Sequence, residues 1–199
     1  MELIESTTSS KIYKLCDKVY KFNKQTTPAR FLNEMLYYNK MSSLKIPNIM
    51  EYLNIDEDIK MIEMKYYPYV LEKYFEGAYP FSISKRKKNE IIYNLVNTMK
   101  ILHENDLYHG DYKAKNILMD YNMNVKISDF NLSSGNQEDK GGDLRKLNLL
   151  IYQILYEVKY DKELYNNYES IFSKIEKDYE GLSINMRNHN LKEIMNYFK

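Results

Sequence analysis

The sequence predicts an α+β fold. Runs of alternating β-branched and aromatic residues, typical of strands, occupy much of the first 64 residues around one helical pattern. Longer patterns with apolar residues three and four positions apart, typical of amphipathic helices, dominate the rest of the chain. A loop with Asp, Lys and Asn at fixed offsets lies between two of these helical patterns. Its polar residues make it the candidate functional site of the chain.

Length, composition and charge limit the class of protein. A chain of 199 residues fits one domain, or two small lobes that share an interface. The hydrophobic content of 44% and the charged content of 29% are ordinary for a soluble globular protein. A net charge of +1 argues against a general nucleic-acid or membrane-surface binder, because such a protein needs a large basic excess. We therefore expect neither nucleic acid nor membrane as a partner.

Cysteine usage and apolar runs indicate the compartment. The single cysteine, Cys16, excludes an internal disulfide framework and suits a reducing environment. No apolar run approaches the roughly 18 residues of a membrane span, and the N-terminus lacks the apolar core of a signal peptide. We expect a soluble, cytoplasmic protein. Abundant Tyr, Lys, Asn, Ile and Met beside scarce Ala, Gly and Pro indicate an AT-rich genome, such as that of a virus or a parasite.

The first predicted element is a β-hairpin with arms 11–15 and 18–22 around the turn Cys16-Asp17. Lys21 lies on the second arm, where an exposed strand lysine is the simplest interpretation. Residues 5–10, just upstream, are Glu and five Ser or Thr residues without a glycine. They fit either a polar loop or a frayed N-terminus.

A helix is predicted over residues 29–41, after Pro28, and it carries Glu34. Its expected apolar stripe consists of Phe31, Leu32, Met35 and Leu36. Further strands are expected around 50–53 and 60–64, joined by the acidic turn 54–58, with a short helix at 71–75.

The longest predicted helix covers residues 84–103, with apolar residues on one face. Its start carries Lys85-Arg86-Lys87-Lys88, a run that also occurs in nuclear-localisation and nucleic-acid patches. A solvated helix face is the interpretation that we favour, because the run lies at the polar start of an amphipathic helix.

The central loop reads H-G-D-Y-K-A-K-N from His109 to Asn116, and Ser128-Asp129-Phe130-Asn131 follows after a short apolar hairpin. The arms of this hairpin, 116–120 and 125–128, alternate in apolar character, so their polar ends meet at one edge. Asp111, Asn116 and Asp129 are therefore expected to lie close together.

This pattern closely resembles the catalytic loop and metal-binding Asp of protein kinases, H-R-D-x-x-x-x-N followed by D-F-G. The resemblance extends from about residue 5 to residue 158. It implies a two-lobed protein-kinase-like α+β fold with a reduced N-lobe sheet and a truncated helical C-lobe. One domain is expected, with the N-lobe at 1–64, the hinge at 65–70 and the C-lobe at 71–199.

The resemblance also implies a catalytic pair and two metal ligands. Asp111 would orient the acceptor hydroxyl and take its proton, and Lys113 would stabilise the transferred phosphoryl charge. Asn116 and Asp129 would hold Mg²⁺ through hard oxygen ligands. ATP and Mg²⁺ are thus the expected cofactors.

The resemblance also implies roles for two residues of the N-lobe. Lys21 would contact the ATP phosphates, as the Lys of V-A-I-K does in kinases, and Glu34 would pair with Lys21 and orient it. A solvated helix glutamate is the alternative interpretation of Glu34.

Three departures from the kinase pattern qualify these roles. Gly110 replaces the Arg that pairs with an activation-loop phosphate, so control by that phosphorylation is not expected. Asn131 replaces the Gly of D-F-G, and Asn tolerates a left-handed backbone better than most residues. The glycine-free segment 5–10 stands where kinases carry a Gly-rich loop, which predicts weaker nucleotide binding.

The region after the loop is unusually short. Only residues 132–142 separate Asn131 from Asp143, and no peptide-docking segment or A-P-E motif is present. Asp143 is expected to open a buried helix, as an N-cap, as a counterpart of the kinase Asp that braces the catalytic loop, or as both. Segment 138–144 is similar to the small atypical kinase of the tRNA-threonylcarbamoylation complex. Two or three short helices are expected over 160–199.

The sequence favours a minimal protein kinase that transfers phosphate from ATP to Ser/Thr hydroxyls of a protein. A catalytically weak kinase mimic that binds a cellular kinase or a regulator stays open, because the Gly-rich loop and the docking segment are missing. A small-molecule kinase is the third alternative. It is disfavoured because H-G-D families of the aminoglycoside- and choline-kinase type usually lack the lysine found here as Lys113.

Overall fold

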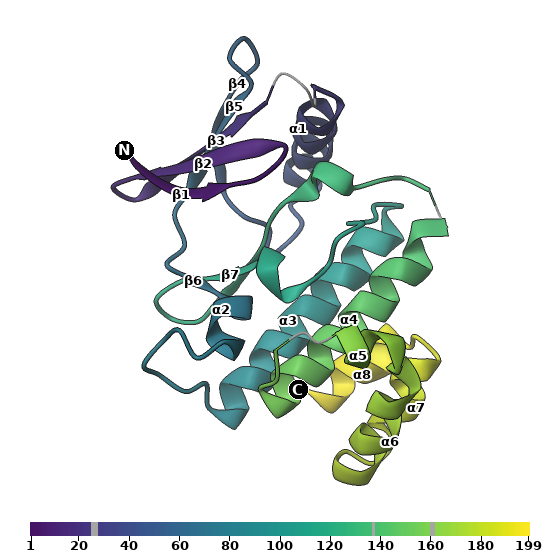
Figure 1. The fold of residues 1–199 in the computed structure, drawn as a ribbon. Helices are drawn as coiled ribbons and strands as arrows, with labels where there is room; N and C mark the ends of the chain where they lie inside the picture. Colours follow the sequence, from purple (N-terminus) through teal and green to yellow (C-terminus); the bar gives the residue numbers. More distant parts are fainter. Residues whose placement is uncertain (25–27, 137, 160–161) are drawn as a thin grey trace.

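The computed structural model describes residues 1–24, 28–136, 138–159 and 162–199, and leaves out the side chains at 131, 138, 164 and 165. A small antiparallel sheet with one helix forms the N-terminal lobe, and a larger, mainly helical lobe lies beside it (Figure 1). This arrangement confirms the predicted α+β, two-lobed fold with a small sheet.

Five antiparallel strands form the N-terminal sheet, in the order β1-β2-β3-β5-β4. The predicted hairpin is confirmed as β2 and β3, whereas β1 is an additional strand where a loop or a frayed end was expected. It forms because residues 2–6 pair with the exposed edge of β2. The strands are β1 (Glu2–Ser6), β2 (Ser10–Leu15), β3 (Lys18–Asn23), β4 (Tyr52–Asp56) and β5 (Met61–Lys65).

The position of the acidic turn was wrong by about two residues. β4 continues to Asp56, so the turn occupies 57–60 rather than 54–58. The carboxylate of Asp56 explains this position, because its Oδ1 accepts hydrogen bonds from the amides of Asp58 and Ile59 at 3.1 and 3.2 Å. A local Asp turn of this kind ends the strand at the aspartate.

Helix α1 (Pro28–Ser43) packs against the sheet, but its buried face differs from the predicted stripe. Phe31 is buried as expected, whereas Leu32 and Leu36 are 47% and 61% exposed. Glu34 and Met41 take the buried positions instead. Glu34 faces the sheet because its partner, Lys21, points inward from β3, as described below.

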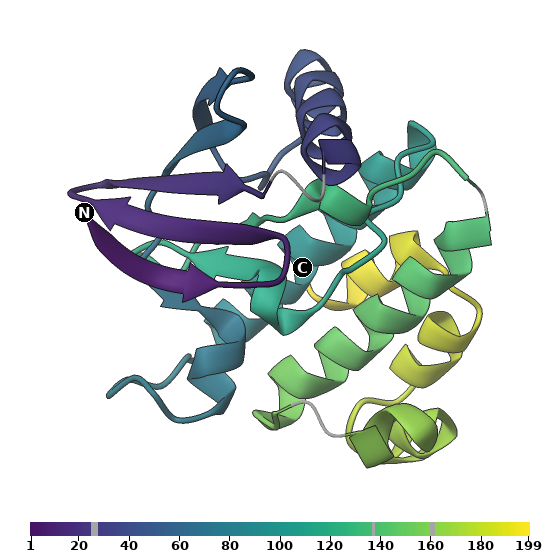
Figure 2. The same cartoon turned by 45° about the horizontal axis from the view of Figure 1, so that its top comes forward.

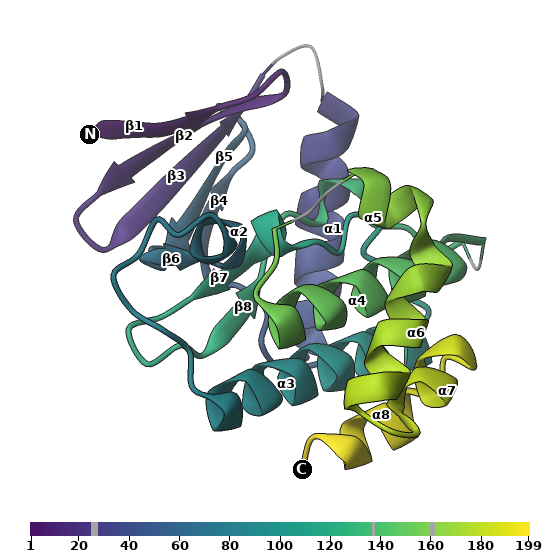
Figure 3. The same cartoon turned by 60° about the horizontal axis from the view of Figure 1, so that its bottom comes forward.

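The core of the larger lobe forms where α3 (Lys85–Glu104) and α4 (Glu138–Tyr156) pack side by side (Figure 3). Ser84 caps α3 by accepting a hydrogen bond from the amide of Lys87 at 3.3 Å. The other elements of this lobe are β6 (Tyr69–Val70), α2 (Leu71–Phe75), the 3-10 turn η1 (Ala114–Asn116), β7 (Ile117–Met119), β8 (Val125–Ile127), the 3-10 turn η2 (Phe130–Leu132), α5 (Lys162–Asn166), α6 (Tyr168–Asp178), α7 (Leu182–Arg187) and α8 (Leu191–Tyr197).

Two predictions for this lobe need correction. Helix α4 begins at Glu138, so Asp143 lies inside the helix and the N-cap interpretation is wrong. Residues 162–199 form four short helices, α5 to α8, rather than two or three. The predicted start of this tail at Tyr160, and the side chain of Tyr165, lie outside the described residues. Within the described part of the chain, no helix has the length and apolarity that crossing a membrane requires.

Candidate active site

A cleft of about 680 Å³ lies between the N-terminal sheet and the loops of the helical lobe. Strands β1 to β3 contribute one wall, and the central loop with the segment after β8 contributes the other. All six predicted site residues line it: Lys21, Glu34, Asp111, Lys113, Asn116 and Asp129.

Lys21 forms the centre of a buried charge cluster. The alternation of β3 directs Lys21 inward, where it is 5% exposed, and Glu34 of α1 is 1% exposed. Its Nζ donates to the two carboxylate oxygens of Glu34 at 3.1 and 2.8 Å, and to Oδ1 of Asp129 at 2.7 Å. Glu34 also accepts a hydrogen bond from the Tyr52 hydroxyl at 3.2 Å. The structure therefore rules out the two simpler interpretations, an exposed lysine and a solvated glutamate.

Burial and ion pairing have opposite effects on the pKa values of the three charged groups in this cluster. Burial by itself lowers the pKa of Lys21, but the carboxylates of Glu34 and Asp129 outweigh burial and raise that pKa above its ordinary value. Burial pushes the pKa of Asp129 upward, yet Lys21 outweighs it and the pKa lies below its ordinary value. Burial raises the pKa of Glu34, which Lys21 only partly opposes. Lys21 is thus held as an ammonium that faces the cleft.

Hydrogen bonds fix the central loop around Asp111. Asn116 Nδ2 donates to the backbone oxygen of Asp111 at 2.8 Å and to its Oδ2 at 3.1 Å. Lys113 Nζ lies 2.8 Å from the same Oδ2, with half of the Lys113 side chain exposed. The other carboxylate oxygen of Asp111, Oδ1, takes part in neither of these contacts. The Asp111 side chain is 20% exposed. A carboxylate held in this way can accept a proton from a hydroxyl in the cleft.

Asp143 of α4 holds the same loop through two of its backbone amides. Its Oδ2 accepts from the amide of His109 at 2.7 Å, and its Oδ1 accepts from the amide of Gly110 at 2.9 Å. The ring Nε2 of His103 lies 3.3 Å from Oδ2. Burial opposes ionisation of Asp143, but the hydrogen bond with His103 and the His109 contacts outweigh it and lower its pKa. Of the two interpretations of Asp143, the brace is confirmed.

Asn116 and Asp129 supply oxygen donors of the kind that Mg²⁺ prefers. Asp129 contributes a carboxylate from a left-handed residue (φ 67°, ψ 64°) that turns the chain after β8. The left-handed position is therefore Asp129, and residue 131 belongs to the 3-10 turn η2. Within the described residues, no group of three or more His, Cys, Asp or Glu side chains is arranged to hold a metal ion. This donor set fits Mg²⁺ that is completed by phosphate oxygens and water.

The sequence of residues 4–152 matches the protein kinase domain family. This chain belongs to the protein kinase family. It is 34% identical to human NUAK family SNF1-like kinase 1 over 108 residues, which are 50% of this chain and 15% of that protein. It is 30% identical to CBL-interacting serine/threonine-protein kinase 10 of Arabidopsis thaliana over 97 residues, 46% of this chain and 20% of that protein.

A third relative is the dual specificity protein kinase zakA of Dictyostelium discoideum, 30% identical over 103 residues, 47% of this chain and 12% of that protein. The matched part thus spans a fifth or less of each of these three kinases.

The turn that stands in place of the kinase Gly-rich loop is held by hydroxyl groups. Oγ1 of Thr7 accepts from the amides of Ser9 and Ser10 at 3.2 and 3.0 Å, and Nζ of Lys24 donates to the Thr7 carbonyl at 2.5 Å. Two backbone amides of the turn are therefore already bonded within the protein. A phosphate would have to displace Thr7 to use them.

A cross-lobe ion pair joins this strand pair to the catalytic loop. Glu5 Oε1 of β1 lies 2.7 Å from Lys115 Nζ, with 36% and 46% of the two side chains exposed. Figure 2 shows the turn of the purple β1–β2 pair next to teal segments of the larger lobe. The contact was not predicted, because Lys115 occupies a variable position of the H-R-D-x-x-x-x-N motif and the segment that holds Glu5 lacks the glycines of the kinase loop.

Lys146 of α4 is a further residue at the site that was not predicted. Its Nζ donates to the Gly110 carbonyl and lies 3.9 Å from Oδ1 of Asp111. The signal that could have found it is its spacing, because a residue three positions after Asp143 shares its helix face.

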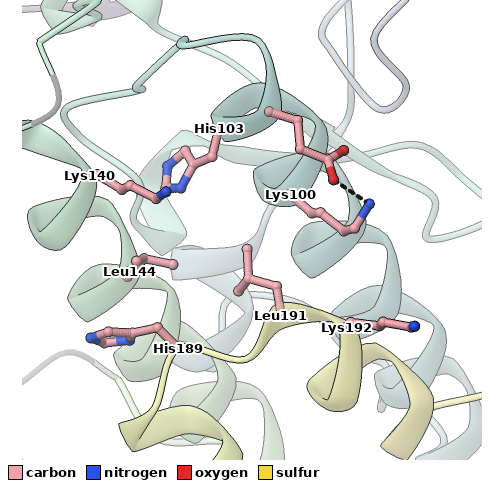
Figure 4. Close-up of a pocket in the computed structure, with 8 residues that line it drawn as sticks. Lys100, His103, Lys140, Leu144, His189, Leu191 and Lys192 are labelled. Atoms are coloured by element: carbon pink, nitrogen blue, oxygen red, sulfur yellow. Dashed lines mark ion pairs between the residues drawn. The ribbon is translucent and has the colours of Figure 1, made fainter.

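A second hollow, of about 210 Å³, lies on the helical lobe between α3, α4 and the start of α8 (Figure 4). Lys100 on its rim is paired with Glu104 at 2.7 Å, and the amine of Lys192 points away from His103 and Lys140. None of the six predicted site residues lines this hollow.

Proposed function

We propose that this kinase-family chain transfers the γ-phosphoryl group of ATP, with Mg²⁺, to Ser or Thr hydroxyls of a protein substrate. The observation that carries the proposal is the contact of Lys21 with both Glu34 and Asp129, at 2.8 and 2.7 Å, in the cleft that also holds Asp111. Phosphoryl transfer depends mainly on positioning and charge neutralisation, and these residues supply both.

In this proposal each cleft residue has one task. Lys21, oriented by Glu34, binds ATP phosphates, while Asn116 and Asp129 hold Mg²⁺ against them. Asp111 accepts the proton of the attacking hydroxyl, and Lys113 stabilises the charge on the transferred group. Residues 1–64 act as the N-lobe, 65–70 as the hinge and 71–199 as the C-lobe.

A kinase mimic is the second candidate function, and the glycine-free turn favours it. The amides of Ser9 and Ser10 are occupied by Thr7 Oγ1, so this turn offers a phosphate fewer free donors. Such a protein would bind a kinase or a regulator without turning over ATP.

One experiment separates the two functions. Phosphate transfer from labelled ATP to peptide pools with Ser, Thr or Tyr acceptors is measured with Mg²⁺ for the wild type, Asp111→Asn and Lys21→Met. Thermal stabilisation by Mg²⁺-ATP is recorded in parallel, because a ligand that binds only the native state raises its stability.

The kinase proposal expects transfer to Ser/Thr pools that falls roughly 10²–10⁴-fold in Asp111→Asn, where the proton acceptor is lost. ATP should still stabilise Asp111→Asn but not Lys21→Met. Stabilisation without turnover that depends on Asp111 would establish the mimic, and no stabilisation at millimolar ATP would exclude the enzyme. Transfer to an added small alcohol or amino sugar alone would indicate a small-molecule kinase.

A further inference from the structure

Asp143 and Lys146 of α4 hold the two consecutive peptide groups on either side of Gly110 in the catalytic loop. Asp143 Oδ1 accepts from the amide of Gly110 at 2.9 Å, and Lys146 Nζ donates to the carbonyl of Gly110. Both groups come from one rigid helix, in positions three residues apart on the same face. The second of these peptide groups joins Gly110 to Asp111.

Gly110 has a backbone conformation that residues with a side chain rarely adopt. Its φ is +78°, a region open to glycine, and glycine lacks the side chain that would restrict its backbone. The Arg of other kinases is absent at this position. A residue with this freedom, next to Asp111, allows the carboxylate to move unless the peptide is held.

Lys146 also lies on the acceptor side of Asp111. Its Nζ is 3.9 Å from Oδ1, whereas Lys113 and Asn116 contact Oδ2 at 2.8 and 3.1 Å. The Lys146 side chain is 31% exposed, so its ammonium is only partly hydrated. Lys146 therefore lies at ion-pair distance from the carboxylate oxygen that Lys113 and Asn116 do not contact.

We propose that Lys146 is a positioning residue for phosphoryl transfer, which holds the Gly110–Asp111 peptide and the Asp111 carboxylate in the reactive orientation. The inference rests on the proposed kinase function for its rate effect, and on the geometry of the loop for its structural effect. ATP contacts are made by other residues, so the role predicts a change in kcat with little change in the KM for ATP.

The test compares Lys146→Met, Lys146→Arg and Lys140→Met. Lys140 lies on α4 and is exposed, so Lys140→Met removes the same charge from the same helix without touching the loop. Lys146→Met should lower kcat roughly 10–100-fold, as expected for a misplaced catalytic group. Lys146→Arg keeps a cationic donor and should recover most of the loss, and Lys140→Met should behave as the wild type.

A readout that does not require activity is amide hydrogen exchange. Peptides covering residues 109–112 should exchange faster in Lys146→Met than in the wild type, while peptides from β3 and α3 stay protected. An inactive wild type would reject the kinase function, and exchange would still decide whether Lys146 holds the loop. Unchanged exchange and unchanged kcat in Lys146→Met would overturn the inference, as would an equal loss in Lys146→Arg.

Discussion

The backbone of Leu132 passes directly against Gly110. A Cβ atom added to Gly110 would lie 2.4 Å from the carbonyl oxygen of Leu132 and 3.0 Å from its carbonyl carbon. The glycine that replaces the kinase Arg is therefore required by the path of the chain after Phe130. Leu132 and Ser134 lie against the catalytic loop, where Ser134 pairs with Tyr108, and only a residue without a side chain at position 110 leaves room for Leu132.

We predict that Gly110→Ala destabilises the protein by about 2–4 kcal/mol, because the alanine combines a strained positive φ with a backbone overlap. Gly77 is a matched control, since its φ is +73° and a Cβ there would meet nothing within 4 Å. Gly77→Ala should cost only the strain, about 1–2 kcal/mol. Urea unfolding measures both variants, and equal costs would show that Leu132 yields to the new methyl group.

We predict that Glu34→Gln weakens both the fold and ATP binding. The variant leaves the buried Lys21 with Asp129 as its remaining carboxylate partner, which should cost about 2–4 kcal/mol of unfolding free energy. ATP-induced stabilisation should also fall, because Lys21 loses the partner that orients it. Glu63→Gln is the control, since Glu63 pairs with Lys18 near the surface of the same sheet at 2.6 Å. A Glu34→Gln protein with normal ATP stabilisation would contradict the orienting role.

We predict that the Glu5–Lys115 pair holds the β1–β2 turn near the catalytic loop. Lys115→Gln should weaken ATP binding roughly two- to fivefold at low salt, because a partly exposed pair contributes at most about 1 kcal/mol. The difference from the wild type should vanish at 0.5 M salt, where the charges are screened. Calorimetric ATP titration measures it, with Lys100→Gln on α3 as a control for loss of charge. A salt-independent effect would point to another role for Lys115.

We predict that acid destabilises the protein through His109. Burial lowers the pKa of His109, and Nδ1 already accepts the amide of Asp111 at 3.2 Å while Nε2 lies 3.0 Å from the Ser128 carbonyl. The folded state thus holds a neutral ring, whereas the unfolded chain binds a proton below a pH of about 6.5. Since the unfolded state then binds more protons, stability falls as pH decreases from about 6.5 toward the folded-state pKa, by up to about 1.4 kcal/mol per unit.

Urea unfolding at pH 7.5 and 5.5 tests this dependence. His109→Asn removes the titrating ring, so its stability should change less between the two pH values than that of the wild type. His189→Asn is the comparison, because the pKa of His189 is also lowered by burial, but its side chain is mostly exposed, so this substitution should change the pH dependence less than His109→Asn. A full pH dependence in His109→Asn would assign the effect to other groups.

Local patterns predicted the parts of the fold that depend on neighbours in sequence. The hairpin of β2 and β3 and the helix α3 follow from periodicity over a few residues. The buried face of α1 could not be predicted in this way, because apolar periodicity places no charged residue inside, and the Glu34–Lys21 pair was expected only from the resemblance to kinases. The start of α4 was also missed, since Gly141 and Gly142 resemble a helix boundary but lie inside the helix with open space around them.

The sequence by itself determined which polar side chains of the central loop line the cleft. The spacing from Asp111 to Lys113, Asn116 and Asp129 lies within one loop and one hairpin, so short-range geometry is enough to bring these side chains together. Only the tertiary structure decided that Gly110 must lack a side chain beneath Leu132, and that Lys146 reaches Asp111. These contacts join residues 22 to 36 positions apart. Their distances depend on how whole helices and turns pack, which no local pattern of residues encodes.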